Sequence, residues 1–181
     1  MSRIGFEAKI GREFVVNVEA VPPASSDAGA GRLVAALRGQ PVDAVNLADS
    51  PLARPRMAPL LFAQTMRDQA GARLEFIPHV TTRDRNRVAL QGLLWGAAAL
   101  GIRSVLIVSG DPVACSRDRA ARPVSDLDVP ALVRLACQAG LRAGVVMDPR
   151  PSQLERELRK LERKLEAGAG FVITQPLYEM E

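Results

Sequence analysis

A βαβ pattern near the middle of the chain constrains the fold more than any other feature. Apolar runs at Leu74–Ile77 and Val105–Val108 flank a helix-like segment, RVALQGLLWGAAALG. The first run leads to His79 and the second to Ser-Gly-Asp at 109–111. A helix of this length can cross back over a sheet so that the two strands run parallel. The pattern therefore predicts a parallel βαβ unit with polar side chains at one edge.

The same alternation extends along the chain. The other strands are predicted at about Phe14–Val18, in VDAVNLADSP, in RAGVVMDP and in AGFVITQ. The other helices are predicted in RLVAALRG, in APLLFAQTMRDQAG, at about Val129–Ala139 and in QLERELRKLERKLEAG, where four leucines form a stripe that we expect to face the core. Six strands alternating with five helices predict an α/β protein with a parallel sheet.

Two α/β architectures satisfy this alternation. An open doubly wound sheet that binds a dinucleotide carries a glycine fingerprint after its first strand, and Pro22-Pro23 stands there instead. A (β/α)8 barrel needs eight units, and the chain supplies about five and a half. The alternation alone leaves both architectures open.

Composition narrows the class of protein. The chain has 181 residues, which predicts a single domain over 1–181, and its net charge of +4 comes from arginines mixed with acids. The chain has no block of like charge and few aromatic residues, which argues against nucleic acid binding. No stretch has the length or apolarity of a membrane span or a signal peptide, and the two cysteines have no metal-ligand spacing. We therefore expect a cytoplasmic protein without a membrane partner.

Polar residues at the strand exits are the candidate site, because both architectures bind ligands at the carboxyl ends of their strands. The candidates are Glu19, Asn46, Asp49, His79, Thr81, Asp111, Asp148, Thr174 and Gln175. They contain no Cys/His cluster, which predicts no metal site. Each has a structural alternative. Glu19 can be solvated at a strand end and His79 can be a structural hydrogen-bonding residue, while Asp111 and Asp148 suit turns and Gln175 can cap backbone groups.

Three separated sequence motifs resemble motifs of a known protein family. They are VDAVNLADSPLARPRM, PHVTTRDRNRVALQGLLWGAAALGIRSVLIVSGDP and KLEAGAGFVITQPLY, in this order. The chain resembles the methylenetetrahydrofolate reductase family from Glu13 to Tyr178, and most of all the members fused to, or partnered with, homocysteine methyltransferases. The resemblance implies a (β/α)8 TIM barrel that binds FAD. It also implies reduction of 5,10-methylenetetrahydrofolate to 5-methyltetrahydrofolate with NAD(P)H, in one-carbon metabolism and methionine synthesis.

The resemblance also implies roles for particular residues. Glu19 matches the family's general acid toward the folate, and a carboxyl in a partly dry barrel mouth can hold a proton near neutral pH. Asp111 matches an aspartate near flavin and folate, whose fixed charge can stabilise a developing cation. His79 and Lys164 match flavin-contacting positions, and Lys164 suits a phosphate. Gln175 matches a folate-contacting glutamine.

Three departures from the family pattern stand beside these matches. Ala48 replaces a threonine that often contacts flavin, and Ser109 replaces an arginine. The sequence given also ends after the sixth predicted strand, so we expect a barrel that is incomplete at its C-terminus, with open strand edges that favour a homo-oligomer or a partner. The alternative to an enzyme is a non-catalytic folate- or flavin-binding module, or a truncated subunit that needs a partner to complete the barrel.

Overall fold

The computed structural model describes residues 6–25, 29–70 and 74–176. Strands and helices alternate after a first short helix. In chain order the elements are α1 (Phe6–Lys9), β1 (Asn17–Ala20), α2 (Ala30–Leu37), β2 (Ala44–Leu47), η1 (Pro51–Ala53), α3 (Pro59–Ala70), β3 (Glu75–Thr81), α4 (Arg87–Ala99), β4 (Ser104–Val108), η2 (Val113–Cys115), α5 (Val129–Gln138), β5 (Arg142–Met147), η3 (Pro151–Gln153), α6 (Leu154–Glu166) and β6 (Phe171–Thr174). None of the helices in these ranges is long and apolar enough to cross a membrane.

The fold class is α/β, as the sequence predicts. The strand order is β1-β2-β3-β4-β5-β6, and the pairings of β1 with β2, β2 with β3, β4 with β5 and β5 with β6 are all parallel. Five helices, α2 to α6, connect the six strands. This is the element order of six successive strands and their five connecting helices in a TIM barrel.

Residue contacts divide the chain into two compact units. The first contains Met1–His79 and Asp111–Arg119, and the second contains Val80–Gly110 and Ala120–Glu181. One boundary between the units therefore falls inside β3.

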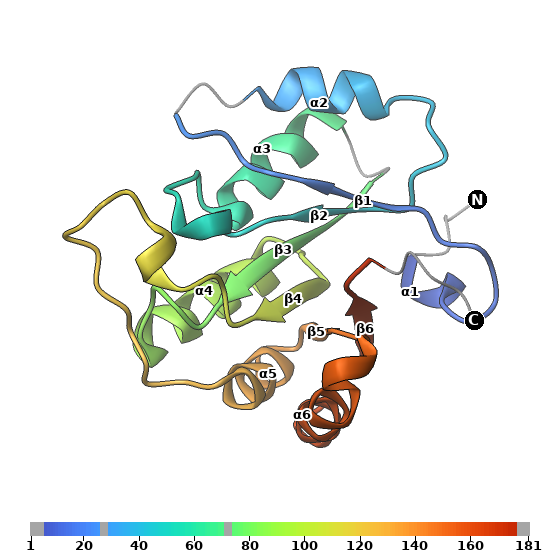
Figure 1. Ribbon diagram of the computed structural model, residues 1–181. Helices are drawn as coiled ribbons and strands as arrows, with labels where there is room; N and C mark the ends of the chain where they lie inside the picture. Colours follow the sequence, from blue (N-terminus) through green and yellow to red (C-terminus); the bar gives the residue numbers. More distant parts are fainter. Residues whose placement is uncertain (1–5, 26–28, 71–73, 177–181) are drawn as a thin grey trace. The chain divides into compact units, whose positions relative to one another are not determined.

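In the first unit, β2 lies between β1 and β3 and is buried along its whole length. Helices α2 and α3 pack against each other, and α3 packs on β2 (Figure 1). Val45 pairs in register with Phe76, and both are almost fully buried with Leu47. These apolar side chains alternate along their strands with Asn46 and Ile77. The opposite face of the strands is therefore free to carry polar residues.

In the second unit, α5 packs on β4 and β5 and also contacts α4 and α6 (Figure 1). Its first turn is capped by Asp128, whose side chain accepts a hydrogen bond from the Ala131 N–H at 2.8 Å. The helix ends just before Gly140, which has a φ of 79°. Both signals are local, so the range predicted from the sequence is confirmed to within a residue.

Two strand boundaries differ from the predicted ones. The first strand was expected to begin at Phe14, but Phe14 is 90 % exposed and β1 begins at Asn17. The reason is that the register with β2 begins at the pair of Asn17 and Ala44, and the Val16 carbonyl just before it accepts a hydrogen bond from the Asp43 N–H, outside β2. Strand β3 extends to Thr81. Glu19 and His79 therefore lie within strands and not after them.

The leucine stripe of α6 was expected to face the core, and this expectation is wrong for three of its four leucines, while Leu161 is half-buried. Leu154, Leu158 and Leu165 are 39 %, 44 % and 47 % exposed in the described part of the chain. Glu157 is instead 8 % exposed and faces inward with Lys164. The polar face of this amphipathic helix is turned toward a pocket, which leaves the leucine face at the surface.

Gly144 lies close to the ring of Phe171, so a substitution at Gly144 tests the packing of the second unit. Gly144 and Phe171 are register partners, and a Cβ on Gly144 would lie 2.2 Å from two atoms of the Phe171 ring. We expect Gly144→Ala to lower the free energy of unfolding by about 1–3 kcal/mol, because the buried ring must shift. Urea unfolding followed by circular dichroism measures this change.

The matched control is Gly92→Ala, in the middle of α4. A Cβ at Gly92 meets nothing within 4 Å, so alanine should be neutral or stabilising by up to about 1 kcal/mol. Equal destabilisation by both substitutions would contradict the packing of Phe171 on Gly144.

Candidate functional site

The first unit places Glu19, Asn46 and His79 on one face of its strands. Glu19 on β1 is in register with Asn46 on β2, and Asn46 is in register with Ile77 on β3. His79 follows Ile77 by two residues, so its side chain lies on the same face. In the sequence, these residues lie at the ends of separate predicted strands. The strand register brings them together on one face of the sheet.

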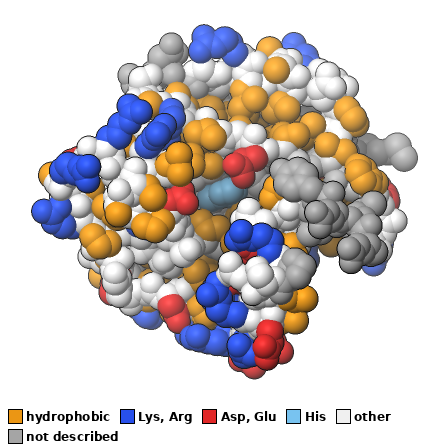
Figure 2. Space-filling view, in the orientation of Figure 1, with side chains coloured by type: hydrophobic (Ala, Val, Ile, Leu, Met, Phe, Trp, Pro, Cys, Tyr) orange, Lys and Arg blue, Asp and Glu red, His pale blue; other side chains and the backbone are white. Residues whose placement is uncertain are grey.

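Two of these side chains carry buried polar atoms that have no partner among the described residues. Asn46 is 7 % exposed, and its Oδ1 accepts no hydrogen bond from the described residues. The Nε2 atom of His79 is likewise buried and unpaired within residues 6–25, 29–70 and 74–176. His79 is the one histidine of the chain, and Figure 2 colours it pale blue on the face shown. A buried polar atom that lacks a partner costs about 1–3 kcal/mol, so such atoms are candidates for ligand contact.

Burial sets the protonation state of His79. Desolvation lowers the pKa of His79 from 6.5 to about 4, and the nearby Asp49 carboxylate opposes this shift only in part. The imidazole is therefore neutral at pH 7, with one nitrogen able to donate and the other able to accept a hydrogen bond. A neutral ring suits a hydrogen bond to a polar ligand atom, and it does not supply a positive charge.

Asp111 is bound to a strained turn of the first unit. Its Oδ2 accepts a hydrogen bond from the Leu52 N–H at 2.5 Å, across 59 residues of sequence. Leu52 has a φ of 55°, and Ser50 and Ala53 next to it also have positive φ values. The left-handed conformation costs a residue with a Cβ about 1–2 kcal/mol, and strain of this kind is common at functional sites. The Asp111 carboxylate thus holds the η1 turn that follows β2.

The second unit contains a pocket of about 720 Å³. Its walls come from the ends of β4 and β5, the first turn of α5 and one face of α6, and the residues are Ser109, Asp128, Val129, Pro130, Val146, Met147, Asp148, Arg150, Glu157, Lys160, Arg163, Lys164 and Gln175. The volume falls in the range of pockets that hold small molecules and cofactors. Lys164 and Gln175, which the sequence analysis selected, both line it.

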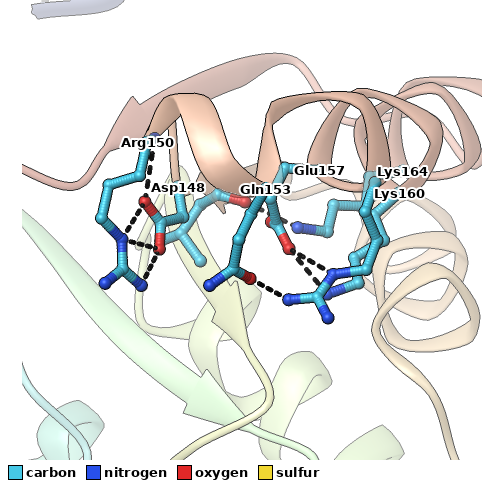
Figure 3. Close-up of polar contacts among 8 residues, drawn as sticks. Asp148, Arg150, Gln153, Glu157, Lys160 and Lys164 are labelled. Carbon is cyan, nitrogen blue, oxygen red and sulfur yellow. Dashed lines mark hydrogen bonds and ion pairs between the residues drawn. The ribbon is translucent and has the colours of Figure 1, made fainter.

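A network of charges covers one wall of this pocket (Figure 3). Lys164 Nζ donates to the Val146 carbonyl at 2.6 Å, and partial burial lowers the pKa of Lys164. Lys160 Nζ donates to Glu157 at 2.7 Å, and this bond lowers the pKa of Glu157. Arg150 Nε contacts both carboxylate oxygens of Asp148, at 2.9 and 2.8 Å. The wall offers cationic donors to an anionic ligand, and Glu157 partly balances their charge.

Glu157 and Lys160 were not selected from the sequence, although a signal was available. They lie seven and four residues before Lys164, a spacing that puts all three on one face of a helix. Asp148 was expected to be a turn residue, and it accepts from the Arg150 N–H at 3.2 Å as a turn residue does. Its side chain also lines the pocket. No group of three metal-ligating side chains occurs in the part of the chain that the structure describes.

Comparison with known proteins identifies the family. The family model for methylenetetrahydrofolate reductase matches residues 8–181, nearly the whole chain. The chain belongs to the methylenetetrahydrofolate reductase family. Among solved structures, it is similar to the carboxyl transferase domain of Rhizobium etli pyruvate carboxylase with pyruvate, with a TM-score of 0.54 and 12 % sequence identity. The match covers 95 % of this chain and 33 % of that one, and at this identity it concerns the fold alone.

Two positions of this methylenetetrahydrofolate reductase family member differ from the expected flavin-contacting pattern. Ala48 is 5 % exposed, and its N–H donates to the Ala20 carbonyl at 3.0 Å. Ser109 is exposed and lines the pocket, and its carbonyl accepts from the Thr82 hydroxyl at 3.5 Å. Both residues keep the backbone of a strand exit in place without supplying the side chain that the resemblance predicts.

The pKa of His79 gives a test of its burial in this reductase family member. The unfolded state takes up a proton near pH 6.5 and the folded state only near pH 4, so stability is complete above pH 6.5 and falls as the pH drops toward 4. The loss from this residue approaches about 3 kcal/mol.

We expect His79→Asn to flatten this part of the stability curve, because asparagine does not titrate. Urea unfolding at pH 7, 5.5 and 4.5 measures the difference between the two proteins, which isolates the contribution of His79 from that of the carboxylates that titrate in both. Parallel curves for the two proteins would show that His79 is accessible to water in the folded state.

Proposed function

We propose that this chain reduces 5,10-methylenetetrahydrofolate to 5-methyltetrahydrofolate with NAD(P)H as the electron donor and FAD as the cofactor. Family membership over residues 8–181 supports a folate-related reductase. The observation that carries the finer assignment is the polar face of β1, β2 and β3. There the exposed Glu19 carboxyl stands in register beside Asn46, on the face that also carries His79.

Glu19 is proposed as the general acid. Opening the methylene bridge requires a proton on a folate nitrogen, and the group that gives it must face the substrate. Glu19 is exposed on its strand, so a bound substrate can reach the carboxyl. The proton leaves a carboxyl oxygen of Glu19 for the folate nitrogen, and the carbon–nitrogen bond of the bridge then opens.

Each unit, taken by itself, carries described residues that suit a part of a flavin cofactor. In the first unit, the unpaired Nε2 of His79 offers a hydrogen bond to a polar ring atom. In the second unit, Lys160, Arg163 and Lys164 line a pocket large enough for part of a dinucleotide. Cationic side chains of this kind bind phosphate by charge-assisted hydrogen bonds. When bound, FAD would accept a hydride from NAD(P)H and pass it to the folate.

Asp111 and Gln175 are proposed as supporting residues. The Asp111 carboxylate is held by the η1 turn, so its negative charge has a fixed position from which to stabilise a developing cation. Gln175 follows β6, and its N–H donates to the Met147 carbonyl at 2.9 Å, which fixes the backbone while the amide side chain is exposed. An exposed amide can both donate to and accept from the polar groups of a folate.

We expect Glu19→Gln to reduce folate reduction by about 10²–10⁴-fold, the usual contribution of a general acid. Reduction of the flavin by NAD(P)H should be nearly unchanged, because that half-reaction needs no proton from Glu19. Stopped-flow absorbance of the flavin separates the two half-reactions.

Glu13→Gln is the matched control. Glu13 is an exposed glutamate that precedes β1 and pairs with Lys9 at 3.7 Å, so its substitution should leave both half-reactions intact. Loss of both half-reactions in Glu19→Gln, with normal flavin binding, would refute the general-acid role.

The second test addresses the cationic wall of the pocket. We expect Lys164→Met and Lys160→Met each to weaken FAD binding about 10-fold or more, because each removes a charge-assisted contact to phosphate. Fluorescence quenching during titration with FAD measures the affinity, and titration with inorganic pyrophosphate measures the phosphate contribution alone.

Arg159→Met is the control on the same helix. Arg159 is exposed, pairs with Glu155 at 2.8 Å and does not line the pocket. An equal loss of FAD affinity in Arg159→Met would indicate a general effect of net charge and not a phosphate site.

A second candidate function is a non-catalytic folate- or flavin-binding module. Ala48 and Ser109 favour it, because each replaces a side chain that the resemblance assigns to flavin contact. A homocysteine methyltransferase partner or a second copy would then complete the site. The flavin absorbance spectrum of the purified protein, followed by NAD(P)H oxidation with methylenetetrahydrofolate, distinguishes the module from the enzyme.

A further inference from the structure

Asn46 carries a buried acceptor that the functions assigned so far do not use. The residue is 7 % exposed, and its Oδ1 accepts no hydrogen bond from residues 6–25, 29–70 or 74–176. The neighbours on the same face of β2 are Ala44 and Ala48, which are small and apolar and offer no donor side chain. An unsatisfied buried acceptor costs about 1–3 kcal/mol, so a partner is needed in some state of the protein.

The register partner of Asn46 that carries a polar side chain is Glu19. Glu19 and Asn46 are direct partners on adjacent parallel strands. Neighbouring strands lie about 4.8 Å apart, so side chains on one face of such a pair are within reach of a hydrogen bond. On the other side of Asn46 the register partner is Ile77, which has no polar atom in its side chain. The register therefore leaves Glu19 as the cross-strand partner for Asn46.

The protonation state of Glu19 decides whether the two can pair through Oδ1. An ionised carboxylate has only acceptors and cannot pair with the Asn46 carbonyl, whereas a protonated carboxyl has one O–H donor. We propose that Asn46 is a positioning residue that accepts a hydrogen bond from the protonated carboxyl of Glu19 and so keeps the acid loaded. The inference rests on the proposed role of Glu19.

The consequence for the reaction is a coupled change at Asn46. When Glu19 gives its proton to the folate nitrogen, the Glu19 O–H bond breaks and the nitrogen–hydrogen bond forms. Asn46 Oδ1 then loses its donor, and only the Nδ2–H groups of Asn46 can pair with the ionised carboxylate. Pairing through Oδ1 is restored when Glu19 takes up a proton again.

Other titratable groups near Glu19 must be separated from this effect. His79 and Glu75 share its face, on β3, while Asp49 follows β2 and Asp111 is bound at the η1 turn. His79 is neutral above about pH 4, so it does not change charge in the neutral range. The carboxylates of Glu75, Asp49 and Asp111 are present in the parent protein, in both Asn46 variants and in the control variant, so they are common to all the proteins compared.

The test uses two substitutions that should shift the pH midpoint of the folate half-reaction in opposite directions. Asn46→Leu removes the acceptor, so the pH midpoint of the folate half-reaction should move about one unit toward acid. Asn46→Asp adds a second carboxyl beside Glu19, so the midpoint should move toward alkaline pH. The rate of flavin reduction by NAD(P)H should not depend on either change.

Asn17→Leu is the matched control. Asn17 lies on the same face of β1 and also has a buried, unpaired Oδ1 among the described residues, but its register partner is Ala44. This substitution should leave the pH midpoint in place. An equal shift in Asn17→Leu, or shifts of the same sign for both Asn46 variants, would overturn the proposal. If Asn46→Leu does not fold, an unchanged or more acidic midpoint in Asn46→Asp overturns it.

A readout that needs no turnover separates this inference from the proposed function. The ¹³C signal of the Glu19 side-chain carboxyl, assigned with Glu19→Gln, can be titrated in the full chain without substrate. A midpoint that moves toward acid in Asn46→Leu and not in Asn17→Leu supports the pairing even if the chain reduces no folate. A midpoint that stays fixed overturns the pairing even if the chain is an active reductase.

Discussion

Parallel pairing of β1, β2 and β3 is the constraint on which the candidate site of the first unit depends. The register places Glu19 beside Asn46, and the two-residue period of β3 puts His79 on the same face. The opposite face of these strands is apolar, with Val45 and Leu47 fully buried. Burial on that face stabilises the sheet, and the stability gained there offsets polar groups that are buried without partners on the other.

The candidate site of the second unit depends on the charged face of a helix and not on strand register. Helix α6 turns its charged face inward, so Glu157, Lys160 and Lys164 line a pocket while Leu154 and Leu158 remain exposed. Glu157 acts as an internal counter-ion for the neighbouring lysine, which keeps the pocket wall from repelling itself when no anion is bound. A cationic pocket with its own carboxylate is suited to bind an anion and to release it again.

Much of the fold was predictable because its signals are local. Alternation of apolar runs and helical segments predicted six parallel strands and five connecting helices, and Asp128 with Gly140 bounded α5. Strand ends were less predictable, since a residue such as Phe14 belongs to a strand only if a partner strand extends beside it. The inward face of α6 was also mispredicted, because four leucines at helical spacing indicate an apolar face and not what covers it.

The sequence by itself determined the α/β alternation, the family and the residue types available for chemistry, because these depend on composition and on neighbours along the chain. Only the tertiary structure decided which of these residues meet. The bond from Leu52 to Asp111 spans 59 residues, and the unpaired atoms of Asn46 and His79 are recognisable only once burial is known. Both depend on strand register and on desolvation, and no local pattern encodes either of them.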